Sequence, residues 1–320
     1  MDNDEISRLF GPVWGASGVQ GFFGEGYRFH RYLGPLAPDF DGLTFVAKTT
    51  TLKERVGNTP LDDNFKPLEM FPKSVHVGVR GFWYGYTLNA WGLSGPGAEK
   101  LLATRRWQNR TMPFMTSFMT VAGSPEEQLA EVVEFSNLLS QHNRAFVGEF
   151  GIQLNLSCPN TDADTGKLIK EAARFLDAMS IIKRPVIVKV SIDMDPKAVA
   201  EIAAHNVCNA LCVSNTVKFG KLPDKINWDK LYGKTSPLAH LGGGGLSGAP
   251  LLPLVAEYVL RLRALGVTKH INAGGGILCP RDVLTLVNAG ANSVSLGCMA
   301  MLRPWRVQST IRYAHSILSK

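Results

Sequence analysis

The sequence predicts a (β/α)8 barrel, the α/β fold in which eight parallel strands close into a ring surrounded by helices. Short apolar segments alternate with amphipathic ones along most of the 320-residue chain, a pattern that indicates a parallel sheet covered by helices. Polar residues follow many apolar segments, which favours a barrel over an open sheet, because a barrel builds its site from all its strand ends. With 45% hydrophobic residues, we expect one barrel domain over residues 1–320.

Eight segments have the length and apolar character of buried strands. The first two are "PVWGAS" and "GLTFVAK", close to the N-terminus. The others are, in order, "MPFMTSFMT", "FGIQLNLS", "PVIVKVS", "ALCVSNT", "HINAGG" and "SVSLG".

Helices are expected between these strands. The segment "SPEEQLAEVVEFSNLLSQHNR" begins with a capping box formed by Ser124 and Glu127, and Pro125 occupies the first helical position. Its apolar stripe is expected to comprise Leu129, Val132, Val133 and Leu139. Asp195 caps the helix of "DPKAVAEIAAHN". Further helices are expected at "LIKEAARFLDAMSII", "PLLPLVAEYVLRLRALG" and "CPRDVLTLVNAGA".

Residues 58–88 do not follow the alternation. They are rich in aromatic residues and proline. We therefore expect a segment inserted over the C-terminal face of the barrel, or a flap that faces a second subunit.

Charge and cysteine content exclude several classes of protein. The formal charge of +7 suits an anionic ligand, but lysine and arginine are scattered, so no nucleic acid partner is expected. None of the five cysteines has C-x2-C spacing, so we expect no metal site and a reducing cytoplasm. The acidic start "MDNDEISRLF" is not a signal peptide, and no apolar run reaches the ~18 residues of a membrane span.

Glycine-rich segments predict a cofactor that carries a phosphate. "HINAGGGI" and "SVSLGC" end the last two strands, where barrels often bind phosphate through backbone N–H groups. "LGGGGLSGAP" adds a flexible loop that would allow a ligand to approach the backbone closely. A dinucleotide fingerprint G-x-G-x-x-G after an early strand is missing, so the pattern indicates FMN or a sugar phosphate.

Polar residues at the strand ends predict a redox site. Lys189 is expected to point inward, where a lysine would stabilise the N1–C2=O edge of a reduced flavin. Asn89, Asn155, Asn160 and Asn215 would together read a planar ring with amide and carbonyl groups, such as a pyrimidine with an acidic substituent. Cys158 lies beside them as a candidate general base. Packing roles are expected for Cys208, Cys212, Cys279 and Cys298.

These motifs resemble the dihydroorotate dehydrogenase family, specifically its cytosolic class 1. "PVWGASG" is similar to the flavin segment N-A-S-G, "AKTTTLKERVGN" to T-K-S-x-T-L-x-x-R-x-G-N, and "LNAWGL" to the substrate-side N-x-x-G-L. "NLSCPNT" matches the family signature, and "VKVS", "SNT", "GGLSG", "AGGGI" and "SLG" follow in the expected order. Class 2 members carry serine as the base and a membrane-associating extension; Cys158 and the missing extension favour class 1.

The resemblance implies FMN-dependent oxidation of dihydroorotate to orotate in pyrimidine biosynthesis, with Cys158 removing the C5 proton while the C6 hydride passes to FMN. Lys48 is implied as a second catalytic residue. The implied substrate contacts are Lys48, Asn89, Gly92, Leu93, Asn155, Asn160, Asn215 and Thr216. The implied FMN contacts are Ala16, Ser17, Gly18, Lys48, Thr49, Asn155, Lys189, Asn215, Gly248, Gly275, Gly276, Gly297 and Cys298.

The resemblance also implies a homodimer that uses fumarate, or an electron-transfer partner subunit that passes electrons to NAD. Three segments depart from the family: Gly95 replaces a second asparagine after N-x-x-G-L, a longer segment follows "RVGN", and "APLLP" replaces A-I-K-P. Three alternatives stay open: a dihydropyrimidine dehydrogenase-like enzyme, a flavin-dependent tRNA dihydrouridine synthase, and a non-catalytic barrel that binds FMN or phosphate.

Overall fold

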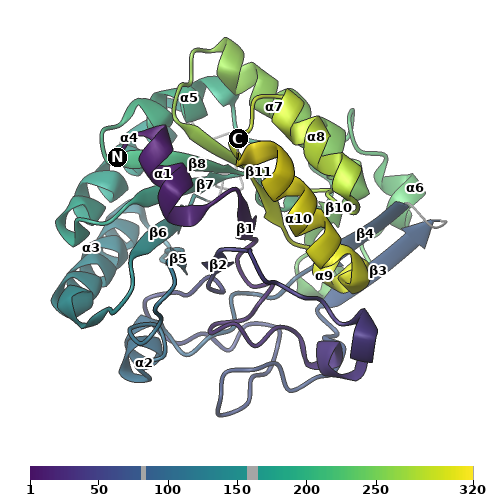
Figure 1. Cartoon of the computed structure of the whole chain (residues 1–320), viewed down its shortest axis with the longest axis horizontal. Helices are drawn as coiled ribbons and strands as arrows, with labels where there is room; N and C mark the ends of the chain where they lie inside the picture. The colour runs from purple at the N-terminus through teal and green to yellow at the C-terminus, as the bar shows by residue number, and fades with distance from the viewer. Residues whose placement is uncertain (81–83, 157–164, 320) are drawn as a thin grey trace.

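Eight parallel strands form a closed barrel at the centre of the computed structural model, which describes residues 1–80, 84–156 and 165–319 (Figure 1). The ring closes between its first two strands, where Gly15 N donates to Thr44 O at 2.9 Å and Thr44 N donates to Val13 O at 2.8 Å. The predicted barrel and its eight strand segments are confirmed. In ring order the strands are β1 (Val13–Gly15), β2 (Phe45–Val46), β5 (Phe114–Phe118), β6 (Phe150–Asn155), β7 (Val186–Val190), β8 (Cys208–Val213), β11 (His270–Gly274) and β12 (Ser293–Leu296).

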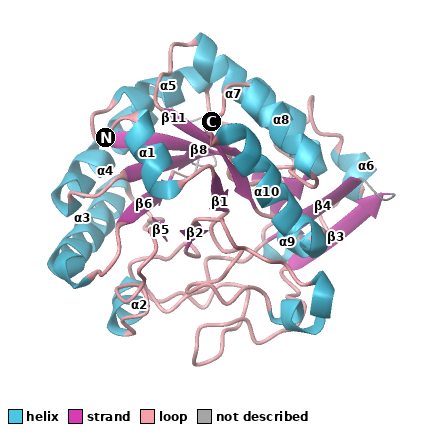
Figure 2. Cartoon of the chain, in the orientation of Figure 1, coloured by secondary structure: helices cyan, strands magenta, loops and turns pink. Residues whose placement is uncertain are grey.

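Helices cover one side of the barrel as an arc, whereas loops make up most of the other side (Figure 2). The longer helices of the arc are α3 (Pro125–His142), α4 (Thr165–Met179), α5 (Pro196–Ala204), α7 (Leu252–Ala264), α8 (Pro280–Asn288) and α10 (Val307–Leu318). Shorter helices are α2 (Ala98–Ala103), α6 (Trp228–Tyr232) and α9 (Met299–Leu302). In the described part of the chain, every helix is too short or too polar to cross a lipid bilayer.

Helix α3 begins at the predicted capping box. Ser124 Oγ accepts a hydrogen bond from Glu127 N at 3.3 Å, and Glu127 Oε2 accepts one from Ser124 N at 3.1 Å. Its predicted apolar stripe is correct for Val132 and Leu139, which are buried, but wrong for Val133, which is 41% exposed. Because successive residues turn by about 100° around a helix, Val133 points away from the face that Val132 buries.

The N-terminal end of the barrel is closed by helix α1 (Asn3–Phe10), a helix that was not among those expected from the sequence. Its Ile6 and Phe10 are fully buried and pack with Trp14 and Ile187 in one cluster. The core therefore fills the barrel from this end, and a ligand has access only from the C-terminal ends of the strands.

A second, antiparallel sheet stands at the C-terminal end of the barrel, at the right of Figure 1. Its strands are, in order, β3 (Val75–Arg80), β4 (Tyr84–Asn89), β10 (Gly245–Gly248) and β9 (Val217–Lys218). β9 and β10 lie in the connection between barrel strands β8 and β11, whereas β3 and β4 come from the segment around residues 58–88. The pairing of β4 with β10 therefore attaches this segment to a loop at the C-terminal face of the barrel. The predicted insertion is confirmed, and it contains regular strands.

Candidate active site

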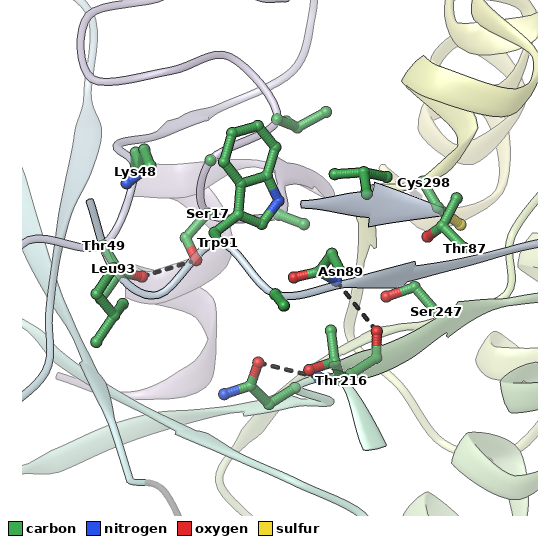
Figure 3. A pocket seen from close by; sticks show the side chains of 18 of the residues that line it. Ser17, Lys48, Thr49, Thr87, Asn89, Trp91, Leu93, Thr216, Ser247 and Cys298 are labelled. Carbon is green, nitrogen blue, oxygen red and sulfur yellow. Dashed lines mark hydrogen bonds between the residues drawn. The ribbon is translucent and has the colours of Figure 1, made fainter. Parts of the chain in front are cut away.

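A cavity of about 630 Å³ opens at the C-terminal ends of the barrel strands (Figure 3). Small-molecule and cofactor sites fall in the range of roughly 300–1,000 Å³. The described residues that line it include four cationic side chains but no aspartate or glutamate. Such a lining attracts anionic ligands. The four cations are Lys48, Arg55, Lys189 and Lys218.

The barrel brings most of the predicted site residues together around this cavity. Cys158 and Asn160 lie outside the described residues. Gly248 is described but is not part of the lining. The predicted residues that line the cavity are Ala16, Ser17, Gly18, Lys48, Thr49, Asn89, Gly92, Leu93, Asn155, Lys189, Asn215, Thr216, Gly275, Gly276, Gly297 and Cys298.

Gly248 is buried in the antiparallel sheet, where β10 runs against β4. It has a φ of +110°, and a Cβ atom there would lie 2.5 Å from both Gly85 O and Tyr86 Cα. A glycine is therefore needed for the close approach of the two strands. The neighbouring Ser247 lines the cavity instead.

Hydrogen bonds connect the polar side chains at the ends of the early barrel strands. Lys189 Nζ donates to Ser17 Oγ at 3.2 Å, and Ser17 Oγ lies 3.1 Å from Thr49 Oγ1. Asn155 Nδ2 also donates to Thr49 Oγ1, at 2.8 Å. We call Ser17, Thr49, Asn155 and Lys189 the polar floor of the cavity. Its side chains come from the ends of β1, β2, β6 and β7, and each is held by at least one other.

Two features of the polar floor indicate a polar ligand. Asn155 is 5% exposed, yet its Oδ1 has no hydrogen-bond partner among the described residues. Burial also lowers the pKa of Lys189, although the nearby thiol of Cys212 acts in the opposite direction. A buried acceptor without a donor and a desolvated cation are both unfavourable unless a ligand pairs with them. A flavin ring, which offers N–H and carbonyl groups, fits this donor and acceptor set.

Lys48 lies on the opposite side of the cavity from Cys298 in Figure 3, two residues after the end of β2. Its Nζ donates to Ser94 O and stands 4.8 Å from the centroid of the Phe22 ring. The surrounding protein lowers the pKa of Lys48 to about 8 by desolvation. The side chain thus remains largely cationic at neutral pH and is available to an anionic group of a ligand.

The loops after β11 and β12 form a cradle of backbone. Gly275 and Gly276 have φ values of +125° and +92°, and a Cβ at Gly276 would lie 2.6 Å from Leu252 N. A side chain at Gly276 would therefore clash with α7, so the backbone itself faces the cavity. Burial raises the pKa of the Cys298 thiol to about 12, so it is neutral. The cradle fits a phosphate held by backbone N–H groups.

Several lining residues were not predicted. They include Tyr27, Leu61, Phe65 and Trp91, together with Arg55 and Asn58. Two signals were present: Arg55 and Asn58 lie within "TLKERVGN", and Trp91 occupies a variable position of N-x-x-G-L. The aromatic residue Tyr27 had no such signal, because it reaches the cavity from an irregular loop.

Comparisons with known proteins point to one family. The family model described as "Dihydroorotate dehydrogenase" matches residues 7–313. The catalytic subunit of dihydroorotate dehydrogenase B (NAD(+)) from Latilactobacillus sakei is 27% identical over 319 residues, covering 98% of this chain and 91% of its own. The same subunit from Listeria welshimeri is 27% identical over 317 residues (93% and 86%). That from Desulforudis audaxviator is 28% identical over 304 residues (92% and 85%).

Proposed function

Because the chain belongs to the dihydroorotate dehydrogenase family, we propose that it oxidises dihydroorotate to orotate with FMN as the resident cofactor. The family match confirms the resemblance predicted from the sequence, and the named relatives belong to its class 1 branch. The family makes the chain an oxidoreductase of pyrimidine biosynthesis.

The observation that carries this proposal is the charge of the cavity lining. Lys48, Arg55, Lys189 and Lys218 face a space whose described lining contains no carboxylate. FMN brings a phosphate and dihydroorotate a carboxylate, so two anionic groups would find cations there. A neutral pyrimidine has no carboxylate and would need fewer cationic side chains.

FMN would be held along the polar floor and the glycine cradle. Ala16, Gly18 and the hydroxyls of Ser17 and Thr49 would contact the ring, and Lys189 would face its carbonyl edge. Asn155 and Asn215 would bind polar atoms of the ring. The phosphate would contact the backbone of Gly275, Gly276, Gly297 and Cys298. When bound, FMN supplies the acceptor for the hydride from C6 of the substrate.

The chain's own side chains would then position the substrate and move one proton. Lys48 and Asn89 would hold the carboxylate and one edge of the ring, beside Gly92 and Leu93. Asn155 and Asn215, with Thr216 and Asn160, would hold the other edge. Cys158 would take the proton from C5 as general base. Cys158 and Asn160 lie outside the described residues, so their roles rest on the resemblance.

Anaerobic mixing of FMN-loaded protein with dihydroorotate tests this proposal. The yellow absorbance of oxidised flavin should disappear, and Cys158→Ala should slow that loss by ~10²-fold or more, the usual contribution of a general base. Cys279→Ala is the matched control, because Cys279 does not line the cavity. If Cys158→Ala reduces its flavin as fast as the wild type, Cys158 is not the base.

A dihydropyrimidine dehydrogenase-like activity is the second candidate, and one observation favours it. At Gly95, where the family carries a second asparagine, a Cβ atom would lie 2.9 Å from the ring of Phe22. The asparagine that the family carries at this position therefore has no room here. Flavin reduction by dihydrouracil but not by dihydroorotate would replace the first proposal with this one.

The reduced flavin must pass its electrons to a second substrate or to a partner protein. The relatives named above are catalytic subunits of NAD(+)-linked enzymes. Their names support the expectation of a partner subunit that receives the electrons. The class 1 resemblance also allows a cytoplasmic homodimer that reduces fumarate itself. Reoxidation of the reduced protein by fumarate in the absence of other proteins would favour the homodimer.

A further inference from the structure

Part of the cavity lining is apolar and comes from outside the barrel. Tyr27, Leu61, Phe65 and Trp91 form this part, and we call these four side chains the apolar roof. None of them belongs to a barrel strand. The roof therefore comes from the irregular loops over the barrel mouth, including the segment after "RVGN" that departs from the family.

Ring stacking and hydrogen bonds hold the roof in place. The rings of Tyr27 and Trp91 stack at a centroid distance of 6.2 Å and an interplanar angle of 15°, and Phe29 stacks on Tyr27 at 5.6 Å. Asn58 N donates to Trp91 O at 3.0 Å, and Asn58 Nδ2 donates to Ala90 O at 2.8 Å. A surface ordered before binding loses little entropy when a ligand contacts it.

The roof adjoins the residues proposed to hold the substrate. Asn89 ends β4, and Trp91 and Leu93 lie in the loop that follows; Figure 3 shows all three side chains around the cavity. The Trp91 indole N–H makes no hydrogen bond to any described residue, so it is free to donate to a carbonyl of a ligand. A substituent on a substrate ring held by Asn89 would thus meet the indole and its apolar neighbours.

Dihydroorotate has little apolar surface that could pack against the roof. Its polar groups are N1–H, C2=O, N3–H and C4=O, and C6 carries the carboxylate. Only the C5 methylene is apolar, so dihydroorotate would cover little of the apolar roof. At the same time Phe22 occupies the space beside Gly95 where the family places a polar side chain. The apolar roof thus lies beside Asn89 and Leu93, which we propose to hold the substrate, and this favours a ligand that is polar on one side only.

We propose that Trp91 and the apolar roof determine specificity for a dihydropyrimidine ring that carries an apolar substituent. This inference rests on the proposed function, because it places the ring on the residues assigned to dihydroorotate. Apolar groups in such pockets change discrimination by about tenfold or more.

The test measures binding of oxidised pyrimidines, which do not react, to FMN-loaded protein. Uracil, orotate and 5-benzyluracil are titrated, and dissociation constants are taken from the change in flavin absorbance. We expect 5-benzyluracil to bind about tenfold more tightly than uracil. Trp91→Ala should remove most of this preference, whereas Trp91→Phe should keep much of it because the ring remains.

Trp305→Ala is the matched control, since Trp305 is 46% exposed and does not line the cavity. FMN affinity is measured for every variant. Equal binding of uracil and 5-benzyluracil by the wild type would overturn the inference. So would a Trp91→Ala protein that loses affinity for FMN and for all three pyrimidines equally, because the roof would then serve the cofactor.

These results can be separated from failure of the proposed function. Binding of oxidised ligands requires no hydride transfer. If 5-benzyluracil is preferred but neither dihydroorotate nor 5-benzyl-5,6-dihydrouracil reduces the flavin, the specificity holds and the proposed reaction is wrong. If dihydroorotate reduces the flavin but 5-benzyluracil has no advantage, the reaction holds and the specificity is wrong.

Discussion

The polar floor and the apolar roof face the same cavity but are built differently. Side chains at the ends of barrel strands form the floor, and they bind one another, as Ser17 and Thr49 do at 3.1 Å. The roof comes from loops and is held by ring stacking, as between Tyr27 and Trp91, and by backbone bonds. In barrel enzymes the strand ends position the catalytic residues, while the sequences of the loops differ between enzymes with different ligands. We therefore expect the floor to serve the reaction and the roof to serve the choice of substrate.

Charge is also divided unequally between the two walls. Lys189 belongs to the floor, Lys48 lies beside it after β2, and desolvation lowers the pKa of both. The roof side chains carry no formal charge. Substitutions in the floor should consequently change the rate of the reaction and its pH dependence, whereas substitutions in the roof should change the choice of ligand.

The largest effect is expected at the floor, from Lys189→Met. Loss of the cation that we propose to face the carbonyl edge of the flavin should slow flavin reduction by ~10²-fold, as for other preorganised electrostatic groups. It should also make the reduction potential of the bound FMN more negative, because the anionic reduced form loses its partner. Stopped-flow absorbance and a dye-linked redox titration measure the two quantities.

Lys53→Met is the control for that experiment, since Lys53 is exposed and does not line the cavity. It should leave both the rate and the potential unchanged. An unaltered potential in Lys189→Met would show that this lysine does not face the flavin, and the floor would lose its proposed chemical role.

A second prediction concerns pH and separates Lys48 from the roof. The pKa of Lys48 is about 8 in the protein without ligand, so its positive charge is present below that pH and is lost above it. The KM for dihydroorotate should therefore rise above about pH 8, by up to about tenfold per pH unit, because the carboxylate loses its cation. Initial rates at several pH values measure this.

Dihydrouracil serves as the control substrate, because it has no carboxylate and its KM should not show this rise. The free energy of unfolding of the ligand-free protein should increase over the pH range in which substrate binding weakens. Since the folded pKa lies below the ordinary value of 10.5, the unfolded chain binds more protons between about pH 8 and 10.5, and stability increases with pH there. If Lys48→Met keeps the same KM profile, another group holds the carboxylate.

The floor could be predicted from the sequence, and the roof could not. Strand periodicity placed Asn155 and Lys189 at strand ends, and parallel strands bring their ends to one face. Tyr27 contacts Trp91 and Asn58 contacts Ala90 across many residues of the sequence, and all four lie outside helices and strands, where no repeat in the sequence indicates the pairing. Gly248, predicted to contact FMN, does not line the cavity, and a glycine required by strand packing has the same sequence pattern as one that binds phosphate.

The smallest effect is expected from the hydrogen bond that holds the roof. Asn58→Ala removes the bond to Ala90 O, which should lower the free energy of unfolding by ~1 kcal/mol, a typical net value for one such bond. Because Trp91 would be held less firmly, the preference for 5-benzyluracil over uracil should fall, while flavin reduction by dihydroorotate should stay near the wild-type rate. Asn64→Ala, at an exposed position of the same segment, is the control. If Asn58→Ala slows flavin reduction as strongly as Lys189→Met, the two walls are not separable, because the roof would then also hold the groups that react.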